Sequence, residues 1–388
     1  MNDLSVETHT LSLHKDGEEL CGDNVVSNQT QKDQVLVLSD GLGSGVKANI
    51  LSTLSSTMVA TMVARGVPLQ EVMDTVLKTL PVCKVRDIAY STFTVFHIRK
   101  GRTVTIINYD NPEPIVLRKG THLPLDYRHI EMSGRTVSIA THSLESGDVL
   151  MSMSDGCIHA GVGEELNFGW QRHHIIEYLE AMYQEDYSAR TLAELLIDEC
   201  ESLYHGRPGD DTTTLALKVR PRRNLNLFVG PPAHKDDDVK AMELFLSKKG
   251  MRVICGGSTA QMFSNHMNVP LEVDMKTATK TMPPAGRLAG IDLVSEGIIT
   301  LSHVLKNAKA HKEGSQRFLF QGKKDTASKL SHLLFEEATD IHFFVGTAIN
   351  PAHQNPDLPI DHSVKMRIIN DLKENLEAMG KRVRMSQF

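Results

Sequence analysis

The stretch VLVLSDGLGSG at residues 35–45 places a β-forming run directly before an acidic, glycine-rich turn. Alternating valine and leucine predict a short buried strand with its end at the Ser-Asp-Gly. Asp-Gly is common at turns, but glycine also lets a backbone approach a ligand closely. Taken alone, Asp40 is either a turn residue or a functional carboxylate.

Three other acidic positions lie near predicted strands: Asp23 before the first clear strand, Asp155 after one, and Asp210 with Asp211 before another. Asp23 lies in CGDN, Asp155 in VLMSMSDG, and Asp210 and Asp211 lie in GDDTTTLAL. Each pair alone is typical of a turn. Four such sites in one domain indicate instead that strands in a sheet bring the carboxylates to one edge. Carboxylates gathered there would repel one another, so the cluster needs a cation.

The ligand chemistry of this cluster narrows the choice of cation. Hard carboxylate oxygens, with no Cys or His at metal-ligand spacing, favour magnesium or manganese over zinc. Two such ions about 3.5–4 Å apart bind a phosphoryl group and activate a bridging water. We therefore predict a site for two Mn²⁺ or Mg²⁺ ions.

Residues 1–219 are predicted to form one α+β domain. Runs rich in Val, Ile, Thr and Phe, bounded by Gly, Asp and Pro, predict strands. These runs are residues 35–39, 91–98, 103–109, 114–118, 148–154 and 212–219. Helices are predicted at residues 46–64, 69–80 and 190–204. Strand hairpins with grouped helices favour a layered sandwich over a regular βαβ repeat.

The basic segment RPRRN at residues 220–224 interrupts the pattern with Pro221 and predicts a domain boundary. A strand, a helix and a strand are predicted after it, at residues 224–230, 237–250 and 251–257. Gly250 is expected to end that helix. The segments 340–346 and 363–383 repeat the same order of elements. We predict a second, α/β domain with βαβ units at residues 224–388.

Composition and charge exclude several classes of protein. Hydrophobic residues make up 40% and charged residues 23% of the 388 residues, as in a soluble globular chain. The formal net charge of -6 argues against a general nucleic-acid surface. No long apolar run and no signal-like N-terminus are seen, so no membrane association is predicted. Five dispersed cysteines predict reduced, mostly buried thiols in a cytoplasmic protein.

Five motifs together carry a family resemblance: GDN, SDGLGSGVKA, NPEPIVLRKG, LMSMSDG and GDDTTTLAL. In order and approximate spacing they resemble the metal-dependent serine/threonine protein phosphatases of type 2C. The resemblance is closest to the bacterial branch of the stage II sporulation protein E phosphatase domain and related regulators of anti-sigma-factor antagonists. It covers about residues 10–219. It implies a two-layer β-sandwich flanked by helices, and hydrolysis of phosphoserine or phosphothreonine in a regulatory protein such as an anti-sigma-factor antagonist.

The resemblance also implies a role for each matching residue. Asp40 would bridge two metal ions, and the Gly41 carbonyl would reach one of them through water. Asp23 would hold one ion through its water shell, while Asp155 and Asp210 would complete the other metal site. Asp40 and Asp23 are therefore the predicted catalytic residues. The nucleophile would be a water between the ions, so no covalent phosphoenzyme is expected.

Further residues around the predicted site have supporting roles in this resemblance. Asp211 would order its turn, while Gly43 and Gly45 would belong to the loop that admits the phosphorylated chain. The larger eukaryotic branch has a phosphate-binding Arg where this sequence has Glu18, which shifts the subfamily rather than the activity. The helix after Gly45 is where the bacterial branch places its regulatory switch, and an ordinary packed helix is the alternative.

Two other classes of function stay open. The chain is alternatively a catalytically inactive binding or sensor module with a phosphatase fold, whose function lies in the second domain. The intact set of four aspartates argues against this reading. A nucleotide-dependent oxidoreductase rests only on the glycine-rich strand ends of the second domain.

The second domain has its own candidate ligand site in the segment RVICGGSTAQM at residues 252–262. Backbone N–H groups at the start of a helix there would cradle a phosphate or another anion. The residues concerned are Gly256, Gly257, Ser258 and Thr259. The alternative is a helix-capping turn with Ser258 or Thr259 as the cap. We expect this domain to sense a ligand or a partner and to set the activity of the first.

Two other segments of the second domain have alternative interpretations. The loop PAHQNPDLPIDH is a weak candidate for a metal site, since proline-rich polar loops often have this composition. Its potential ligands are His353, Asp357, Asp361 and His362. The helix predicted at the end of residues 291–308 is either core or the face of a homodimer.

Overall fold

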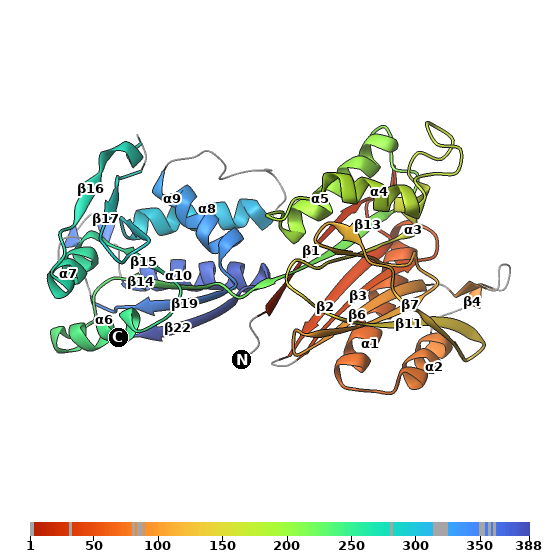
Figure 1. Cartoon of the computed structure of the whole chain (residues 1–388), viewed down its shortest axis with the longest axis horizontal. Helices are drawn as coiled ribbons and strands as arrows, with labels where there is room; N and C mark the ends of the chain where they lie inside the picture. Colours follow the sequence, from red (N-terminus) through yellow and green to blue (C-terminus); the bar gives the residue numbers. More distant parts are fainter. Residues whose placement is uncertain are drawn as a thin grey trace. The chain divides into compact units, whose positions relative to one another are not determined.

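The computed structural model describes residues 4–30, 33–79, 82–83, 88–89, 91–279, 282–312, 325–348, 354–355, 358–359 and 362–388. The chain divides into two compact units, Met1–Pro221 and Arg222–Phe388, called unit 1 and unit 2 here (Figure 1). Unit 1 contains the aspartates of the predicted metal site.

Two antiparallel sheets form the centre of unit 1. The first contains β1 (Leu4–Leu13), β8 (Ile115–Arg118), β9 (Thr121–His122), β12 (Val149–Met153) and β13 (Thr212–Pro221). The second contains β2 (Asp23–Gln29), β3 (Asp33–Gly41), β6 (Ser91–Arg99), β7 (Thr103–Tyr109), β10 (Arg128–Met132) and β11 (Arg135–Ser143). Their strand orders are β1-β13-β12-β8-β9 and β10-β11-β7-β6-β3-β2. A two-residue pair, β4 (Val82–Cys83) and β5 (Ile88–Ala89), is separate.

The alternation of side chains in β3 explains why its sequence is apolar on both faces. Leu36 and Leu38 enter the core between the two sheets, where Leu150 of β12 also packs. Val35 and Val37 point the other way. There they pack under the helices α1 (Gly45–Ala64) and α2 (Leu69–Thr79).

The outer face of the first sheet is covered by a second group of helices. These are α3 (Asp155–His159), α4 (Arg172–Met182) and α5 (Ala189–Leu203). Met151 of β12 shares a core with Ile175 of α4 and Leu192 of α5. Helices thus flank both outer faces of a two-layer β-sandwich, which confirms the predicted fold class.

Two features of unit 1 differ from the sequence-based expectation. Asp40 was expected past the end of its strand, but β3 continues to Gly41 because β2 and β6 pair with it on both sides. Strands β1 and β11 were not predicted. Polar and apolar residues are mixed along both strands. Each is fixed by pairing with a neighbour, β1 with β13 and β11 with β7.

Unit 2 is a mostly parallel sheet covered on both faces. Its strands are β14 (Asn224–Val229), β15 (Met251–Cys255), β16 (Glu272–Asp274), β17 (Ala285–Arg287), β18 (Leu293–Ser295), β19 (Asp340–Val345) and β22 (Arg382–Gln387). The order is β16-β17-β18-β15-β14-β19-β22, and the run from β18 to β22 is parallel. Another two-residue pair is β20 (Gln354–Asn355) and β21 (Leu358–Pro359).

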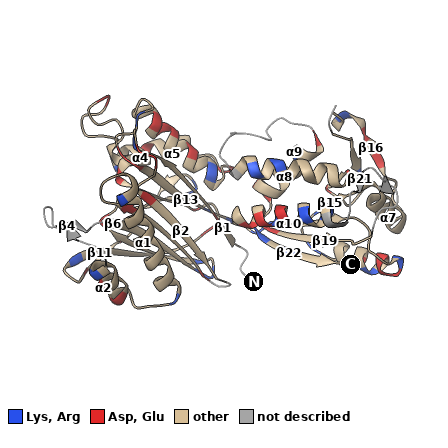
Figure 2. Cartoon of the chain, turned by 180° about the vertical axis from the view of Figure 1, so that it is seen from behind, with Lys and Arg blue, Asp and Glu red and all other residues tan. Residues whose placement is uncertain are grey.

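Helices divide between the two faces of this sheet. One face carries α6 (Asp238–Leu246) and α7 (Gly257–Met267). The other carries α8 (Ile298–Lys312), α9 (Thr326–His332) and α10 (His362–Ala378). Acidic and basic residues are interspersed along α10, as on a solvated helix face (Figure 2). None of the described helices combines the length and apolar composition that a membrane span requires.

Gly250 does not end the helix that precedes it. The α6 helix stops at Leu246, four residues earlier than the expected end. Gly250 has a φ of 105°, and a Cβ there would lie 2.2 Å from the Asn224 carbonyl oxygen. The glycine is therefore needed for a close backbone approach at the start of β14.

Candidate metal centre

The strand pairing of unit 1 brings together the four aspartates that the sequence singles out. Asp23 begins β2 and lies directly opposite Asp40 of β3. Asp155 follows β12 and Asp210 precedes β13, and these two strands are paired near those ends. Asp40 experiences the charges of the other three carboxylates. The acidic edge, defined as Asp23, Asp40, Asp155 and Asp210, is therefore one cluster.

Glycines allow the backbone around the acidic edge to pack closely. A Cβ on Gly41 would lie 2.1 Å from the Ala48 carbonyl oxygen of α1. A Cβ on Gly156 would lie 2.2 Å from the Asp211 carbonyl oxygen. Because real Cβ atoms do not approach this closely, the Asp-Gly pairs are required by packing as well as by the turn. The Asp155 side of the cluster is thereby held against residues 210–211.

Burial and mutual repulsion disfavour the ionised forms of these carboxyls. Burial raises the pKa of Asp40 to about 9, and repulsion from Asp23 and Asp155 adds to the rise. Burial likewise raises the pKa of Asp23 to about 7. The pKa of Asp210 is raised by burial and by the nearby Asp155. A divalent cation would reverse this preference, because it stabilises the ionised carboxylates.

Asp23 provides a test of whether a cation fits. Its side chain is only 6% exposed. Neither of its carboxylate oxygens has a hydrogen bond of ordinary geometry among the described residues, and the nearby Ser154 and Thr213 hydroxyls offset only part of the effect of burial on its pKa. A buried carboxylate in this condition is unfavourable unless a cation or a proton compensates it. The surrounding donors are carboxylate oxygens, which Mg²⁺ and Mn²⁺ accept readily, so the residues present fit such an ion.

Asp211 makes contacts different from those of its neighbour. Its Oδ1 accepts a hydrogen bond from the Lys15 backbone N–H at 3.1 Å. Its Oδ2 would lie 2.8 Å from a Cβ on Gly22. Asp210 instead accepts from the Asp211 N–H at 3.0 Å and forms an ion pair with the Lys15 ammonium at 3.9 Å. Asp211 thus connects the start of β13 to the segment that precedes β2.

The loop after Asp40 contains one open and one crowded glycine. Gly43 has a φ of 103°, and a Cβ there would meet nothing within 4 Å. Gly45 has a φ of 65°, and a Cβ would lie 2.3 Å from a Glu18 carboxylate oxygen. The Ser44 hydroxyl donates to the other Glu18 oxygen at 2.9 Å. Glu18 therefore lies at the N-terminus of α1, where the helix dipole favours a negative charge.

The α1 helix rests on polar side chains beneath the acidic edge. Hydroxyls of Ser39, Ser55 and Ser91 lie 2.6–2.8 Å from one another, and all three residues are buried. The Ser91 hydroxyl also donates to the Asp40 carbonyl oxygen at 2.9 Å. This interface depends on hydrogen-bond geometry rather than on apolar contact alone. From the sequence, α1 is either a regulatory switch or an ordinary packed helix. Both interpretations remain predictions.

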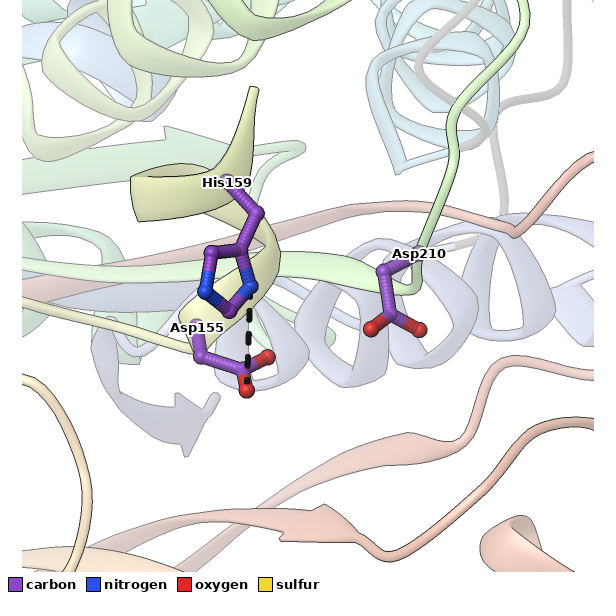
Figure 3. Close-up of side chains that lie close together, drawn as sticks. All are labelled: Asp155, His159 and Asp210. Atoms are coloured by element: carbon purple, nitrogen blue, oxygen red, sulfur yellow. Dashed lines mark ion pairs between the residues drawn. The ribbon is translucent and has the colours of Figure 1, made fainter. Parts of the chain in front are cut away.

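One residue near the acidic edge was missed from sequence. His159 lies one turn after Asp155 on α3, and its Nδ1 is 3.9 Å from the Asp155 Oδ2 (Figure 3). Potential ligand atoms of Asp155, His159 and Asp210 all lie within 4.8 Å of one another. The i, i+4 spacing in SDGCIH was the available signal, because a helix begins directly at Asp155. The expectation that no His stands at metal-ligand spacing is therefore wrong.

A groove of about 570 Å³ adjoins this part of the acidic edge. Asp155 and His159 form one side of it, and Thr136 and Ser138 of β11 line another part. Asn108 of β7 and residues 110–113 between β7 and β8 also contribute. The groove is large enough for a short stretch of polypeptide beside the carboxylates.

The glycine pair of unit 2 lies between β15 and α7. The helix begins at Gly257 and its N-cap is Gly256, so Ser258 and Thr259 are first-turn residues rather than caps. A Cβ on Gly257 would meet nothing within 4 Å. Thr259 is fully buried, and its hydroxyl has no hydrogen-bond partner among the described residues. That hydroxyl lies 3.0 Å from the position of a Cβ on Gly256, which places it at the glycine turn.

The weaker metal candidate in the second domain lies outside the described residues. His353, Asp357 and Asp361 are not among them, and the side chain of His362 is not described. The structure therefore does not test this metal site.

Comparisons with known proteins identify relatives of unit 1. The family of stage II sporulation protein E (SpoIIE) matches residues 30–220. The phosphatase domain with a regulatory fragment of SpoIIE from Bacillus subtilis is 18% identical over 56% of this chain, with a TM-score of 0.49. The chain spans 64% of that structure. No curated protein matches the chain.

Two other solved structures are similar to the chain. The RsbU and RsbW domains of a Mycobacterium tuberculosis protein are 19% identical over 63% of this chain and 68% of that one, with a TM-score of 0.44. RsbX, in complex with magnesium, is 20% identical over 55% of this chain and 95% of its own, with a TM-score of 0.38.

Proposed function

Because unit 1 of this chain belongs to the SpoIIE family of type 2C phosphatases, we propose that the chain is a metal-dependent protein phosphatase. Its substrate is a phosphoserine or phosphothreonine of a regulatory protein, such as an anti-sigma-factor antagonist. The observation that carries this proposal is the convergence of Asp23, Asp40, Asp155 and Asp210 in a cluster whose charge needs a cation.

Each carboxylate has a distinct place in the proposed reaction. Asp40, whose carboxyl experiences the charges of the other three, would hold both ions, and Asp23 would orient the water shell of one of them. Asp155 and Asp210 would hold the other ion. When bound, two Mn²⁺ or Mg²⁺ ions would neutralise phosphoryl charge and lower the pKa of a water molecule. Lys15 adds positive charge at the rim, 3.9 Å from Asp210.

The groove beside Asp155 supports a polypeptide substrate. Asp155 of the acidic edge lines it, so a phosphorylated side chain would reach this edge while its flanking residues lie along the groove. Arg172 lines it and donates to the carbonyl oxygens of Glu113 and Pro114. Arg172 thereby holds in place the segment between β7 and β8 that lines the groove.

Hydrolysis assays of the full chain with Mn²⁺ test the proposal. The substrates are p-nitrophenyl phosphate and a phosphoserine protein. We expect Asp40→Asn to lower kcat/KM about a thousand-fold, because one lost metal contact removes several kcal/mol of charge stabilisation. Asp126→Asn changes an exposed aspartate and serves as the control. Failure of the unmodified chain on both substrates would support the inactive binding module instead.

Unit 2 is proposed to regulate this activity by binding a ligand that carries an oxyanion. The supporting observations are the open Gly257 at the start of α7 and the buried, unpartnered Thr259 hydroxyl beside it. Backbone N–H groups at a helix N-terminus favour an anion, and ligands of parallel sheets bind at the carboxyl ends of the strands.

Inorganic phosphate is a suitable probe of the unit 2 site. Phosphate should raise the Tm of the full chain, and Thr259→Val should remove most of that shift. Thr326→Val is the matched control, because Thr326 is also a buried first-turn threonine of a helix with an unpartnered hydroxyl. Equal shifts in both variants would leave an adventitious ion only. A phosphate effect on hydrolysis that Thr259→Val removes would support regulation.

A further inference from the structure

The geometry of α3 points to a metal ligand that the four-aspartate site does not include. We propose that the His159 imidazole binds one of the two divalent cations together with Asp155 and Asp210, and that this nitrogen ligand makes the site prefer Mn²⁺ to Mg²⁺. This inference rests on the proposed metal-dependent function of unit 1, and it concerns which metal that function uses.

The first argument is the spacing of the ligand atoms. The three potential ligand atoms lie within 4.8 Å of one another. Ligands of one ion are each about 2.1 Å from it and so lie about 3–4 Å apart. The separation of 3.9 Å between His159 Nδ1 and Asp155 Oδ2 falls in that range and is too long for a hydrogen bond. Figure 3 shows that the three side chains lie close together, with His159 directly beside Asp155.

The second argument is the local backbone. Helix α3 starts at Asp155 and spans five residues, so Asp155 and His159 share one face. Gly156 lets this helix start pack against the Asp211 carbonyl, which places the shared face beside Asp210. The fold therefore holds all three groups on one side of the acidic edge.

The third argument is the charge that surrounds this face. Both Asp23 oxygens are buried without a hydrogen bond of ordinary geometry among the described residues, and Asp155 is one of the charges that act on Asp23. The cluster thus calls for a cation independently of His159. The side chains of His159 and Asp155 are 54% and 49% exposed, so an ion from solvent can reach them.

The metal preference follows from the chemistry of the donors. Mg²⁺ is a hard cation that takes oxygen ligands and keeps several waters. Mn²⁺ accepts the same carboxylate and water ligands as Mg²⁺, but as a first-row transition metal it also binds at sites with nitrogen donors. A site with two carboxylates and one imidazole should therefore gain more from His159 when Mn²⁺ is bound than when Mg²⁺ is bound.

Metal binding to the metal-free full chain tests this directly. Calorimetric titrations with Mn²⁺ and with Mg²⁺ would compare the unmodified chain with His159→Gln. We expect His159→Gln to weaken Mn²⁺ binding about tenfold and Mg²⁺ binding less than about threefold. His205→Gln is the matched control, because His205 is a similarly exposed His, 3.7 Å from Glu165.

Electron spin-echo spectroscopy of bound Mn²⁺ gives a second readout. The unmodified chain and His205→Gln should show a directly coordinated nitrogen, and His159→Gln should lack it. Bound Mn²⁺ without a coordinated nitrogen, or an equal loss of Mn²⁺ and Mg²⁺ affinity in His159→Gln, would overturn this inference alone. A chain that binds neither ion would also remove the metal-dependent function on which the inference rests.

Discussion

Two buried aspartates of unit 1, Asp148 and Asp23, differ in their hydrogen-bond partners. Asp148 is fully buried, and Arg118 donates to both of its oxygens, from Nε at 2.8 Å and from Nη2 at 2.9 Å. The Glu145 N–H and the His142 ring lie 2.8 Å and 3.1 Å from its Oδ2. Asp23 is almost as deeply buried, but its oxygens have no hydrogen bond of ordinary geometry among the described residues.

The two environments shift acidity in opposite directions. Burial opposes ionisation of Asp148, but hydrogen bonds from His142 and Arg118 outweigh it and lower its pKa to about 2. Burial raises the pKa of Asp23 to about 7, and the nearby Ser154 and Thr213 hydroxyls offset only part of this rise. The charge of Asp148 is thus compensated by Arg118 and His142. The charge of the acidic edge needs a proton or a bound cation instead. Perturbed groups of the second kind are those that mark functional sites.

The largest expected effect comes from breaking the satisfied cluster. Asp148→Asn would leave Arg118 without its buried partner, and we expect the free energy of unfolding to fall by about 3 kcal/mol. Urea unfolding of the full chain, compared with Asp126→Asn, measures this. A loss no larger than that of the exposed control would show that Asp148 does not stabilise unit 1.

Packing at the acidic edge gives the next effect. In Gly156→Ala the new Cβ would lie 2.2 Å from the Asp211 carbonyl oxygen, so the backbone must shift. We expect a loss of about 2 kcal/mol in stability and weaker Mn²⁺ binding, because Asp155 moves relative to Asp210. Gly257→Ala is the control, since its Cβ would enter open space. Normal Mn²⁺ binding by Gly156→Ala would show that close packing at residue 156 is not required for metal binding.

A conservative change sharpens the comparison further. Arg118→Lys keeps the positive charge beside Asp148 but loses the paired donation to both oxygens. We expect a loss of about 1 kcal/mol, smaller than that of Asp148→Asn, because charge survives while geometry does not. If Arg118→Lys lowered the free energy of unfolding as much as Asp148→Asn, the bidentate hydrogen bonding rather than the charge would account for the whole effect.

The two clusters also differ in the sign of their pH dependence. The folded-state pKa of Asp148, about 2, is below its ordinary value of 3.8, so its stabilisation is present above pH 3.8 and is lost as the pH falls through about 2. In metal-free protein the pKa of Asp40 is about 9, so its contribution is lost as the pH rises from 3.8 through about 9.

Thermal unfolding across pH separates these contributions. In a chelator, the unmodified chain should lose stability from pH 5 to pH 9, and Asp40→Asn should lose less. Saturating Mn²⁺ should flatten the curve of the unmodified chain. A chain whose Tm falls equally with and without Mn²⁺ would contradict the assignment of the repulsion to the acidic edge.

The sequence predicted which strands lie next to the aspartates better than it predicted where those strands begin and end. The β3, β12 and β13 strands follow from apolar runs, because burial on both faces leaves a strong local signal. The extension of β3 through Asp40 does not, since it depends on pairing with β2, and β2 is polar in sequence. Pairing partners are set by tertiary contacts that local patterns do not contain.

The candidate site shows the same division. Asp-Gly pairs at strand ends marked Asp40 and Asp155, and the GDN and GDD motifs marked Asp23 and Asp210. The approach of His159 to Asp155 depends on a helix start that SDGCIH indicates only weakly. In unit 2, the glycine pair was visible, yet the unpartnered Thr259 hydroxyl depends on how α7 packs. Sequence patterns located the backbone turns, and packing decided which polar atoms were left without partners.

Calorimetric titration of the metal-free full chain with Mn²⁺ is the most direct test of the central claim, which is that the acidic edge exists to bind divalent cations. The account predicts that the unmodified chain binds Mn²⁺ and that Asp40→Asn binds it at least about a hundred-fold more weakly. Equal affinity in the two proteins, or no binding by the unmodified chain, would contradict it.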